Sequence, residues 1–412
     1  MTSTSAPPEP FVTLLSHVPY YRHAAVALDD AGYLERYLAM WSATAPMRGA
    51  GLPVVGRVIE HVNNTRVFPE LRGRPVTDLL AGQIGSQAAQ RVFDRQSVGR
   101  ALPARSFAWD INARWHLTRR HRPRVLHAVS GIALHSARAA KARGAYIVID
   151  VRAAYPRSRA AVIGPALARH GIDYHMANEA NLDRLDAEYE LADLIVCCSE
   201  LARDSFVDAG FAPDRVAAID LGCDTDRFVP AASPPDRFTA LFVGRERREK
   251  GFVDVATAAR ALAPTSALLV SGDRDDDAEA WLAGVRATVE FLGMVPAARM
   301  PSVYQRGSVL VLPSLAEGFG MVVVEAMASG LPVIVSDKTG AVDAVTDGVN
   351  GFVIPAGDAD ALADRLRQLE ADPALVASMG AASRERAPAY SWAAYGRHLV
   401  DLYDTRIIPA LA

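Results

Sequence analysis

Lysine is scarce in this sequence, although basic residues are common. Arginine supplies nearly all of the 44 lysine and arginine residues, and the lysines are Lys141, Lys250 and Lys338. The bias indicates a GC-rich bacterial genome, which is a statement about coding and not about chemistry. It gives each lysine more weight as a functional candidate, because arginine fills the ordinary basic positions.

Cysteine is also rare, and its distribution argues against two structural roles. Cys197 and Cys198 are adjacent in an apolar run, and Cys223 stands alone. An odd count without regular spacing argues against a disulfide framework and against structural zinc, and it favours a reducing cytoplasm.

The sequence has no large excess of charge and no long hydrophobic run. Its formal net charge is -3, so there is no electrostatic case for nucleic acid as a partner. No apolar stretch reaches the roughly 20 residues of a membrane span. The N-terminus has neither the basic region nor the apolar core of a signal sequence. We therefore expect a cytoplasmic protein.

The sequence does contain enough apolar material for two domains. It has 412 residues, of which 50% are hydrophobic. Apolar runs alternate with helical patterns, which predicts an α/β fold with parallel sheets. The predicted strands are 11–16, 124–129, 146–151, one beginning at 194, one beginning at 215, 238–245, 266–273, 289–296, 308–313 and 331–336. The predicted helices are 24–41, pieces within 76–93, 105–120, one with Lys141 near its end, 178–191, 199–210, one ending near 262, and others after 358. Residues 347–352 are predicted as a turn.

The most informative stretch runs from residue 308 to residue 336. Two apolar strands flank a loop that contains Glu317, Gly318 and Gly320, followed by a short helix. In such a β-α-β unit the loop lies at the carboxyl end of a parallel strand, where open α/β sheets bind ligands. The glycines let the backbone approach a ligand, and the free amides of the helix N-terminus attract phosphate.

Two carboxylates flank this phosphate-attracting backbone. Glu317 lies in the loop, and Glu325 lies on the same helix face as Met321. Phosphate needs no carboxylate, but the hydroxyl groups of a sugar and of a ribose need hydrogen-bond acceptors. The stretch therefore predicts a site for a sugar attached to a nucleoside diphosphate.

A second cluster of candidates follows the strand at 238–245. Arg245 ends this strand, and Lys250 precedes the next helix. Two cations at a strand's carboxyl end and a helix N-terminus suit a diphosphate. The alternative is a pair of solvated basic residues in an arginine-rich loop.

These motifs resemble those of a known family. Glu317 and Glu325, with seven residues between them, lie within Glu-Gly-Phe-Gly and Glu-Ala-Met-Ala-Ser-Gly-Leu-Pro-Val. This pattern resembles the donor-sugar motif of family 4 retaining glycosyltransferases, and Arg245 and Lys250 match that family's Gly-Arg, four residues, Lys-Gly pattern. The resemblance implies the GT-B fold, in which two Rossmann-like domains face each other across a cleft. It divides the chain into an acceptor domain (1–232), a donor domain (233–390) and a closing helix (391–412) that returns to the first domain.

The resemblance also implies an activity and a set of site residues. The activity is metal-independent transfer of a sugar from a nucleoside-diphosphate sugar to a hydroxyl or amine of a small molecule or glycan, with no cofactor. The implied catalytic residues are Glu317, Arg245 and Lys250. The implied donor-binding residues are Gly318, Phe319, Gly320, Met321, Glu325 and, near the nucleobase, Met294.

Candidates on the acceptor side come from the ends of the N-terminal strands. They are Arg22, His23, His127, Asp150 and Arg152. Each has a structural alternative: a surface turn for Arg22 and His23, a buried core histidine for His127, and an ordinary ion pair for Asp150 with Arg152.

Two charged segments have open interpretations. The basic segment Arg114–Arg124 is either a helix end that complements the helix dipole or a patch for an anionic membrane surface or an anionic acceptor. The acidic run beginning at Asp273 is either a metal cluster or, as we expect, a solvated run before a helix. The sequence gives no indication of the oligomeric state.

Three other functions are alternatives to this activity. One is a catalytically silent subunit that binds a nucleotide sugar, and another is a transferase that uses an unusual donor to form a C–N bond. The third, an NAD-dependent dehydrogenase, requires Gly-x-Gly-x-x-Gly after a strand. The sequence contains no such run.

Overall fold

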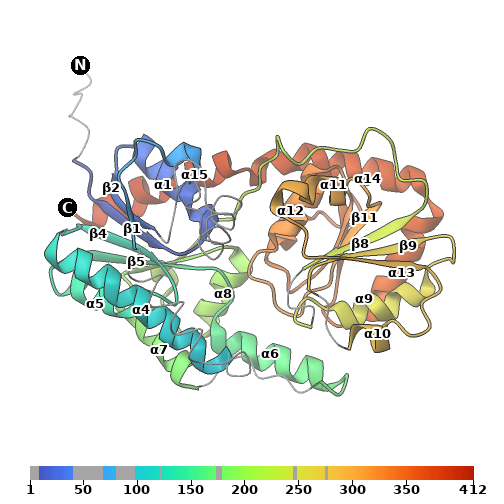
Figure 1. Cartoon of the computed structure of the whole chain (residues 1–412), viewed down its shortest axis with the longest axis horizontal. Coiled ribbons are helices and arrows are strands. Elements are labelled where there is room, and N and C mark those ends of the chain that lie inside the picture. The colour runs from blue at the N-terminus through green and yellow to red at the C-terminus, as the bar shows by residue number, and fades with distance from the viewer. Residues whose placement is uncertain are drawn as a thin grey trace, which may run out of the picture.

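The computed structural model describes residues 9–39, 68–79, 98–120, 122–172, 179–244, 248–273 and 277–412. The described residues form two α/β domains that lie side by side along the long axis (Figure 1). Each domain is built on one sheet in which all strand pairs are parallel. This confirms the α/β class and the GT-B architecture expected from the sequence.

The first sheet has the strand order β3-β2-β1-β4-β5-β6-β7. Its strands are β1 (Val12–Ser16), β2 (Leu34–Ala39), β3 (Val76–Asp78), β4 (Val125–Val129), β5 (Tyr146–Val151), β6 (Leu194–Cys197) and β7 (Val216–Ala218). The helices of this part are α1 (Arg22–Asp30), α4 (Val98–Arg119), α5 (Leu134–Lys141), α6 (Pro156–Ala168), α7 (Glu179–Leu191) and α8 (Glu200–Asp208).

The second sheet has the order β10-β9-β8-β11-β12-β13. Its strands are β8 (Thr239–Val243), β9 (Ala267–Ser271), β10 (Thr288–Gly293), β11 (Val309–Leu312), β12 (Val333–Ser336) and β13 (Gly351–Ile354). The helices that follow along this half are α9 (Phe252–Ala258), α10 (Ala278–Trp281), α11 (Met300–Tyr304), α12 (Met321–Ala328), α13 (Ala359–Ala371), α14 (Pro373–Arg386), α15 (Trp392–Leu402) and α16 (Ile408–Ala410).

The central strands read as continuous apolar runs because helices cover both faces of each sheet. All residues of β4, β8 and β11 are buried. Figure 1 shows α1 and α15 on one side of the first sheet and α4, α5 and α7 on the other. Helix α15 packs against α1, with Gly396 close to Ala27, although these helices lie at opposite ends of the sequence.

The long helix predicted for 24–41 is wrong. Helix α1 ends at Asp30, where Gly32 takes a left-handed conformation (φ 78°) and the Tyr33 amide bonds back to the Leu28 carbonyl. Residues 34–39 form β2, which pairs with β1 on one side and with β3 on the other. This pairing on both sides outweighs the helical pattern of the sequence.

Other differences are smaller. Residues 76–78, predicted to be helical, form β3, and most of the rest of 76–93 lies outside the described residues. Residues 351–352, predicted as part of a turn, begin β13. Helix α6 was not predicted at all.

A close crossing near the edge of the second sheet depends on a glycine. Gly251 precedes α9 in the left-handed region (φ 73°), and a Cβ atom there would lie 2.1 Å from the carbonyl oxygen of Pro313. The loop before α9 therefore passes directly over the end of β11. Both the conformation and the close contact exclude a side chain at this position.

We expect Gly251→Ala to lower the free energy of unfolding by about 2 to 4 kcal/mol, because it adds a steric clash to the cost of a left-handed alanine. Gly348→Ala is the matched control, since its φ is 75° but no atom lies within 4 Å of its Cβ position. The control should lose about 1 kcal/mol. Urea unfolding of both variants measures the difference, and equal losses would show that the clash does not exist.

Candidate functional site

The loop between β11 and α12 lies at the carboxyl end of its strand and is held from the β12 side. The Glu317 amide donates to the Lys338 carbonyl at 2.9 Å, and the Glu317 carbonyl accepts from the Gly340 amide at 3.0 Å. The Ser336 hydroxyl donates to the Ser314 carbonyl at 2.5 Å. These bonds tether the backbone of Ser314 and Glu317 to the loop after β12.

Helix α12 begins without a side-chain cap. Gly320 precedes it with φ 93°, and no side chain accepts a hydrogen bond from its first amides. Such an N-terminus carries partial positive charge and attracts anions. Phe319 buries its ring, and its carbonyl accepts from the Ala341 amide at 2.6 Å. Phe319 therefore has only its amide to offer to a ligand.

Lys250 and Glu317 come from different loops and form an ion pair. The Lys250 Nζ and Glu317 Oε2 atoms are 2.6 Å apart, and about a fifth of each side chain is exposed. The absence of a side chain at Gly244 leaves room for the Lys250 side chain, because a Cβ at Gly244 would lie 2.4 Å from Lys250 Cδ. Arg245, the other predicted cation, lies outside the described residues.

The carboxyl group of Glu325 lies deeper in the fold. It accepts a hydrogen bond from the Tyr304 hydroxyl at 2.6 Å. Burial raises the pKa of Glu325 to about 7, although the Tyr304 hydrogen bond and the charge of Arg227 act in the opposite direction. Burial also raises the pKa of Tyr304 well above its usual value, so this hydroxyl remains a donor at neutral pH.

A cavity of about 480 Å³ brings Glu325 and Met321 together with the first domain. Arg22 and His23 also line it, so they share a cavity with the predicted donor residues and not with Asp150 and Arg152. Met294 is half exposed just after β10 and is not among the residues that line this cavity.

His23 is held as a neutral ring. It stacks on Trp392 with a centroid distance of 4.3 Å. Burial, with a smaller contribution from the charge of Arg22, lowers the pKa of His23 to about 3. Arg22 forms an ion pair with Glu70 and lies over the Phe68 ring.

Asp150 is the centre of a buried polar cluster at the end of β5. It accepts from the Tyr21 hydroxyl at 3.0 Å, and Arg152 Nε lies 3.0 Å from its other oxygen. His127 Nε2 is 3.5 Å from Asp150, and His127 Nδ1 is 2.9 Å from the Tyr403 hydroxyl. The His127 side chain is fully buried, so this geometry gives it no contact with an acceptor.

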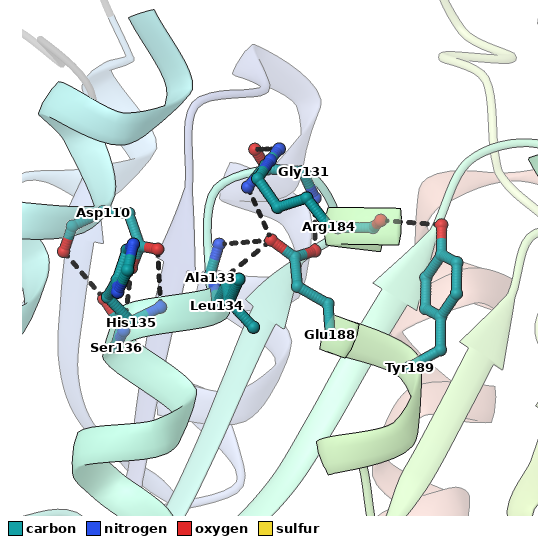
Figure 2. A network of polar contacts seen from close by, with 10 residues as sticks. Asp110, Gly131, Ala133, Leu134, His135, Ser136, Arg184, Glu188 and Tyr189 are labelled. Atoms are coloured by element: carbon teal, nitrogen blue, oxygen red, sulfur yellow. Dashed lines mark hydrogen bonds and ion pairs between the residues drawn. The ribbon is translucent and has the colours of Figure 1, made fainter. Parts of the chain in front are cut away.

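Asp150 and Arg152 do line a second cavity, of about 430 Å³, in the first domain. The loop after β4 forms one wall of this cavity, and hydrogen bonds to Glu188 hold this loop in place. The Glu188 carboxylate accepts from the amides of Gly131, Ala133 and Leu134 at 2.6, 3.0 and 3.1 Å (Figure 2). Arg184 pairs with the same carboxylate and also donates to the Gly131 carbonyl.

A second carboxylate completes the N-terminus of α5. Asp110 accepts from the His135 and Ser136 amides at 2.6 and 2.8 Å and from the Ser136 hydroxyl at 2.6 Å (Figure 2). Burial raises the pKa of Asp110 and of Glu188. The position that would attract an anion at this helix is therefore filled by the protein's own carboxylates.

Asp110 and Glu188 were not among the residues predicted from the sequence. Their partners lie 25 residues or more away along the chain, and no motif marks them. The one available signal was that each adjoins a large aromatic residue, Trp109 or Tyr189, on the buried face of its helix.

Two further findings concern metals and membranes. Among the described residues, no group of three or more His, Cys, Asp or Glu side chains could hold a metal ion. Residues 274–276 of the acidic run lie outside them. No helix in the part of the chain searched is long and apolar enough to cross a membrane.

Two family models match the chain in succession. Residues 74–227 match the model described as Glycosyltransferase Family 4, and residues 225–386 match the model described as Glycosyl transferases group 1. Together the two matches run from residue 74 to residue 386, well over half of the chain.

Curated relatives include proteins named D-inositol 3-phosphate glycosyltransferase. The protein from Corynebacterium aurimucosum is 38% identical over 120 residues, which is 29% of this chain and 28% of the relative. The protein from Corynebacterium urealyticum is 33% identical over 184 residues, 41% of this chain and 43% of the relative. These matches span less than half of the length of the relatives.

Solved structures with a similar fold cover nearly the whole chain. Sucrose-phosphate synthase from Thermosynechococcus elongatus superimposes with a TM-score of 0.68 at 22% identity, covering 98% of this chain and 100% of that chain. HepE from Anabaena, determined in complex with UDP and glucose, gives 0.65 at 18% identity, with 96% and 100% covered. At these identities the likeness concerns the fold alone. The consecutive family matches, together with two parallel sheets in the GT-B arrangement, show that this chain belongs to the family 4 (group 1) glycosyltransferases.

Proposed function

We propose that this protein transfers a sugar from a nucleoside-diphosphate sugar to a hydroxyl group of an acceptor, with retention of anomeric configuration and without a metal ion. One observation carries the proposal. Lys250 and Glu317 meet at 2.6 Å next to the uncapped N-terminus of α12, whose Gly320 lies against the Glu317 side chain. Cation, helix N-terminus and carboxylate are the three groups that a diphosphate joined to a sugar requires.

The donor would lie across this edge of the second sheet. Its diphosphate faces Lys250 and the amides before α12, and its sugar hydroxyls face Glu317. Glu325 lies one turn into α12 and accepts from the ribose hydroxyls. The solved HepE structures contain UDP with glucose, or UDP-glucose, which supports a nucleotide sugar as the donor of this chain as well.

The reaction needs charge stabilisation more than it needs a protein base. The bond between the anomeric carbon and a diphosphate oxygen breaks, and the acceptor oxygen forms its bond on the same face of the sugar. The proton of the acceptor hydroxyl passes to the departing diphosphate oxygen. Lys250, Arg245 and the α12 amides stabilise the negative charge on that diphosphate, and one preorganised donor of this kind is typically worth a factor of about 100 to 1,000 in rate.

The acceptor would enter from the cavity that contains Asp150 and Arg152. This cavity adjoins the donor loop, because a Cβ at Gly318 would lie 2.2 Å from the Arg152 carbonyl. The Asp150 carboxylate pairs with Arg152, so the charges at this end of the cavity are balanced. A compact acceptor with several hydroxyl groups suits such a lining.

We expect Lys250→Ala to reduce sugar transfer or donor hydrolysis by a factor of about 100 or more, because it removes a cation from the diphosphate. Lys338→Ala is the matched control, since this lysine is nearby but about half exposed and paired with Asp337. Both are assayed against a panel of nucleotide sugars in excess EDTA. Wild-type turnover in Lys250→Ala, or activity that returns only with added metal, would contradict the mechanism.

The same assay separates an enzyme from a catalytically silent binding subunit. A transferase slowly hydrolyses its donor when no acceptor is present. A silent subunit binds the nucleotide sugar and raises the thermal stability of the protein, but it leaves the donor intact. Binding without hydrolysis or transfer in the wild-type protein would therefore replace the proposed activity with that alternative.

The raised pKa of Glu325 leads to a prediction about stability. In the folded protein the pKa is about 7 instead of its usual 4.5, so stability falls as the pH rises from about 4.5 to 7. Glutamine carries no charge and still accepts from Tyr304. We expect Glu325→Gln to be more stable than wild type by about 1 to 2 kcal/mol at pH 8, with a smaller difference at pH 5.

Urea unfolding at the two pH values measures this difference. Glu317→Gln is the control, because it removes a carboxylate that is paired with Lys250. An equal change in both variants, or a larger gain at pH 5, would contradict the buried state of Glu325.

A peripheral membrane contact through Arg114–Arg124 is also part of the proposal. Arg114, Arg119 and Arg120 are exposed at the end of α4. Trp115 is 40% exposed, and the guanidinium groups of Arg119 and Arg120 lie 5.9 and 5.3 Å from its ring centroid. Basic residues around an exposed tryptophan suit the anionic headgroup region of a bilayer.

We expect the protein to sediment with vesicles that contain phosphatidylglycerol and not with pure phosphatidylcholine vesicles. The double variant Arg119→Ser/Arg120→Ser should bind about 30-fold more weakly, because each basic residue near an anionic surface is worth about 1 kcal/mol. The control Arg306→Ser/Arg367→Ser removes two exposed arginines of the second domain. Equal loss in both double variants would leave no specific role for α4.

A further inference from the structure

The loop that carries Glu317 contacts the first domain as well as its own. The Ser199 hydroxyl donates to the Gly318 carbonyl at 2.7 Å, and both residues are buried. Ser199 is also the N-cap of α8, where its oxygen accepts from the Ala202 amide at 3.1 Å. The Ser199 hydroxyl therefore donates a hydrogen bond to the second domain and accepts one from the first.

The glycines around this bond are explained by the contact between domains. Gly318 does not have a left-handed φ, so its conformation does not require glycine. A Cβ at Gly318 would lie 2.2 Å from the Arg152 carbonyl oxygen and 2.7 Å from Ala153 Cα. A Cβ at Gly340 would lie 2.0 Å from the Gly318 carbonyl oxygen and 2.6 Å from Ser199 Oγ. Backbone from both domains therefore surrounds the Gly318 peptide.

A second link joins the first domain to the residue before Lys250. Arg159 of α6 forms an ion pair with Glu249, whose side chain is almost fully buried. The Glu249 carbonyl in turn accepts from the Leu315 amide at 2.8 Å. Each member of the Lys250–Glu317 pair is therefore next in sequence to a residue that bonds to the first domain. Glu249 precedes Lys250, and Gly318 follows Glu317. Apolar residues of α6, Ile163 and Leu167, pack in one cluster with Leu315.

We propose that Ser199 is a positioning residue: its hydroxyl fixes the Gly318 peptide, and with it Glu317, only while the two domains are in contact. The bond crosses between domains, so separation of the domains breaks it and leaves the Gly318 carbonyl without this donor. Domain closure and ordering of the Glu317 loop thus form one transition. The inference rests on the proposed function only where it assigns Glu317 to the donor sugar.

Hydrogen exchange tests the inference without any substrate. In Ser199→Ala we expect amide exchange in peptides that cover residues 315–322 to be about three- to tenfold faster, because one buried hydrogen bond is lost. Asp372→Ala is the matched control, since Asp372 caps α14 by accepting a hydrogen bond from the Leu375 amide. It loses a helix cap but should leave exchange in the loop unchanged.

A second variant approaches the same contact from the other domain. Gly318→Ala adds a Cβ that must displace the Arg152 backbone, so exchange in the same peptides should rise by a similar factor. Unchanged exchange in either Ser199→Ala or Gly318→Ala would overturn the inference. An equal rise in Asp372→Ala would also overturn it, because the effect would then follow general loss of stability.

Kinetics distinguish positioning from a structural role. Ser199→Ala should lower kcat for transfer or donor hydrolysis by about three- to tenfold. Its Kd for free UDP, measured by calorimetry, should stay at the wild-type value, because Lys250 and Glu325 remain in place. A weaker Kd with unchanged kcat would overturn the role of Ser199. Absence of turnover in the wild-type protein would count against the proposed function, while the exchange measurement would still decide the inference about Ser199.

Discussion

The arrangement of this molecule depends on one constraint, which is that a parallel strand must always end at the same edge of its sheet. Every strand pair in both sheets is parallel, so the loops that leave the strands collect along one edge of each domain. Glu317 and Lys250 meet because β11 and β8 are neighbours in the second sheet. In the first sheet β4 lies between β1 and β5, so His127 of β4 and Tyr21 after β1 lie close to Asp150 of β5. These residues run from Tyr21 to Glu317 in the sequence but lie at two edges.

The helix N-termini at these edges differ in whether side chains of the protein cap them. Helix α5 begins against two buried carboxylates, Glu188 and Asp110, which occupy its free amides. Helix α12 begins after Gly320 with no side-chain cap. The partial positive charge of α5 is thus neutralised within the protein, and that of α12 is left for a ligand. The N-terminus of α5 is therefore a structural part of the first domain, whereas the N-terminus of α12 can bind a ligand in the second.

The sequence was sufficient where short-range pattern decides the structure. The apolar runs located β4, β5, β8 and β11, and Ser199 with Gly210 marked the two ends of α8. The motif around Glu317 and Glu325 placed both residues correctly relative to α12.

The predictions that were wrong or missing concern residues whose structure depends on distant partners. Residues 34–39 form a strand because β1 is beside them, and the helical pattern gave no sign of that pairing. The long-range contacts of Glu188, Asp110 and Ser199 leave no local signature, because each side chain meets backbone groups that are remote in sequence. Gly318 was expected to make room for a ligand, but the backbone of Arg152 and Ala153 fills the space that its side chain would take.

The end of the chain completes the core of the beginning. Tyr403 is fully buried, its hydroxyl lies 2.9 Å from His127, and its ring contacts Phe11 and Tyr33. Ile407 is also buried in the same cluster. During synthesis the ribosome releases the first sheet long before these residues exist. The first domain therefore lacks part of its core until the second domain has been synthesised. Vectorial folding in which an N-terminal domain matures first would leave this domain without the layer that contains Tyr403 and Ile407.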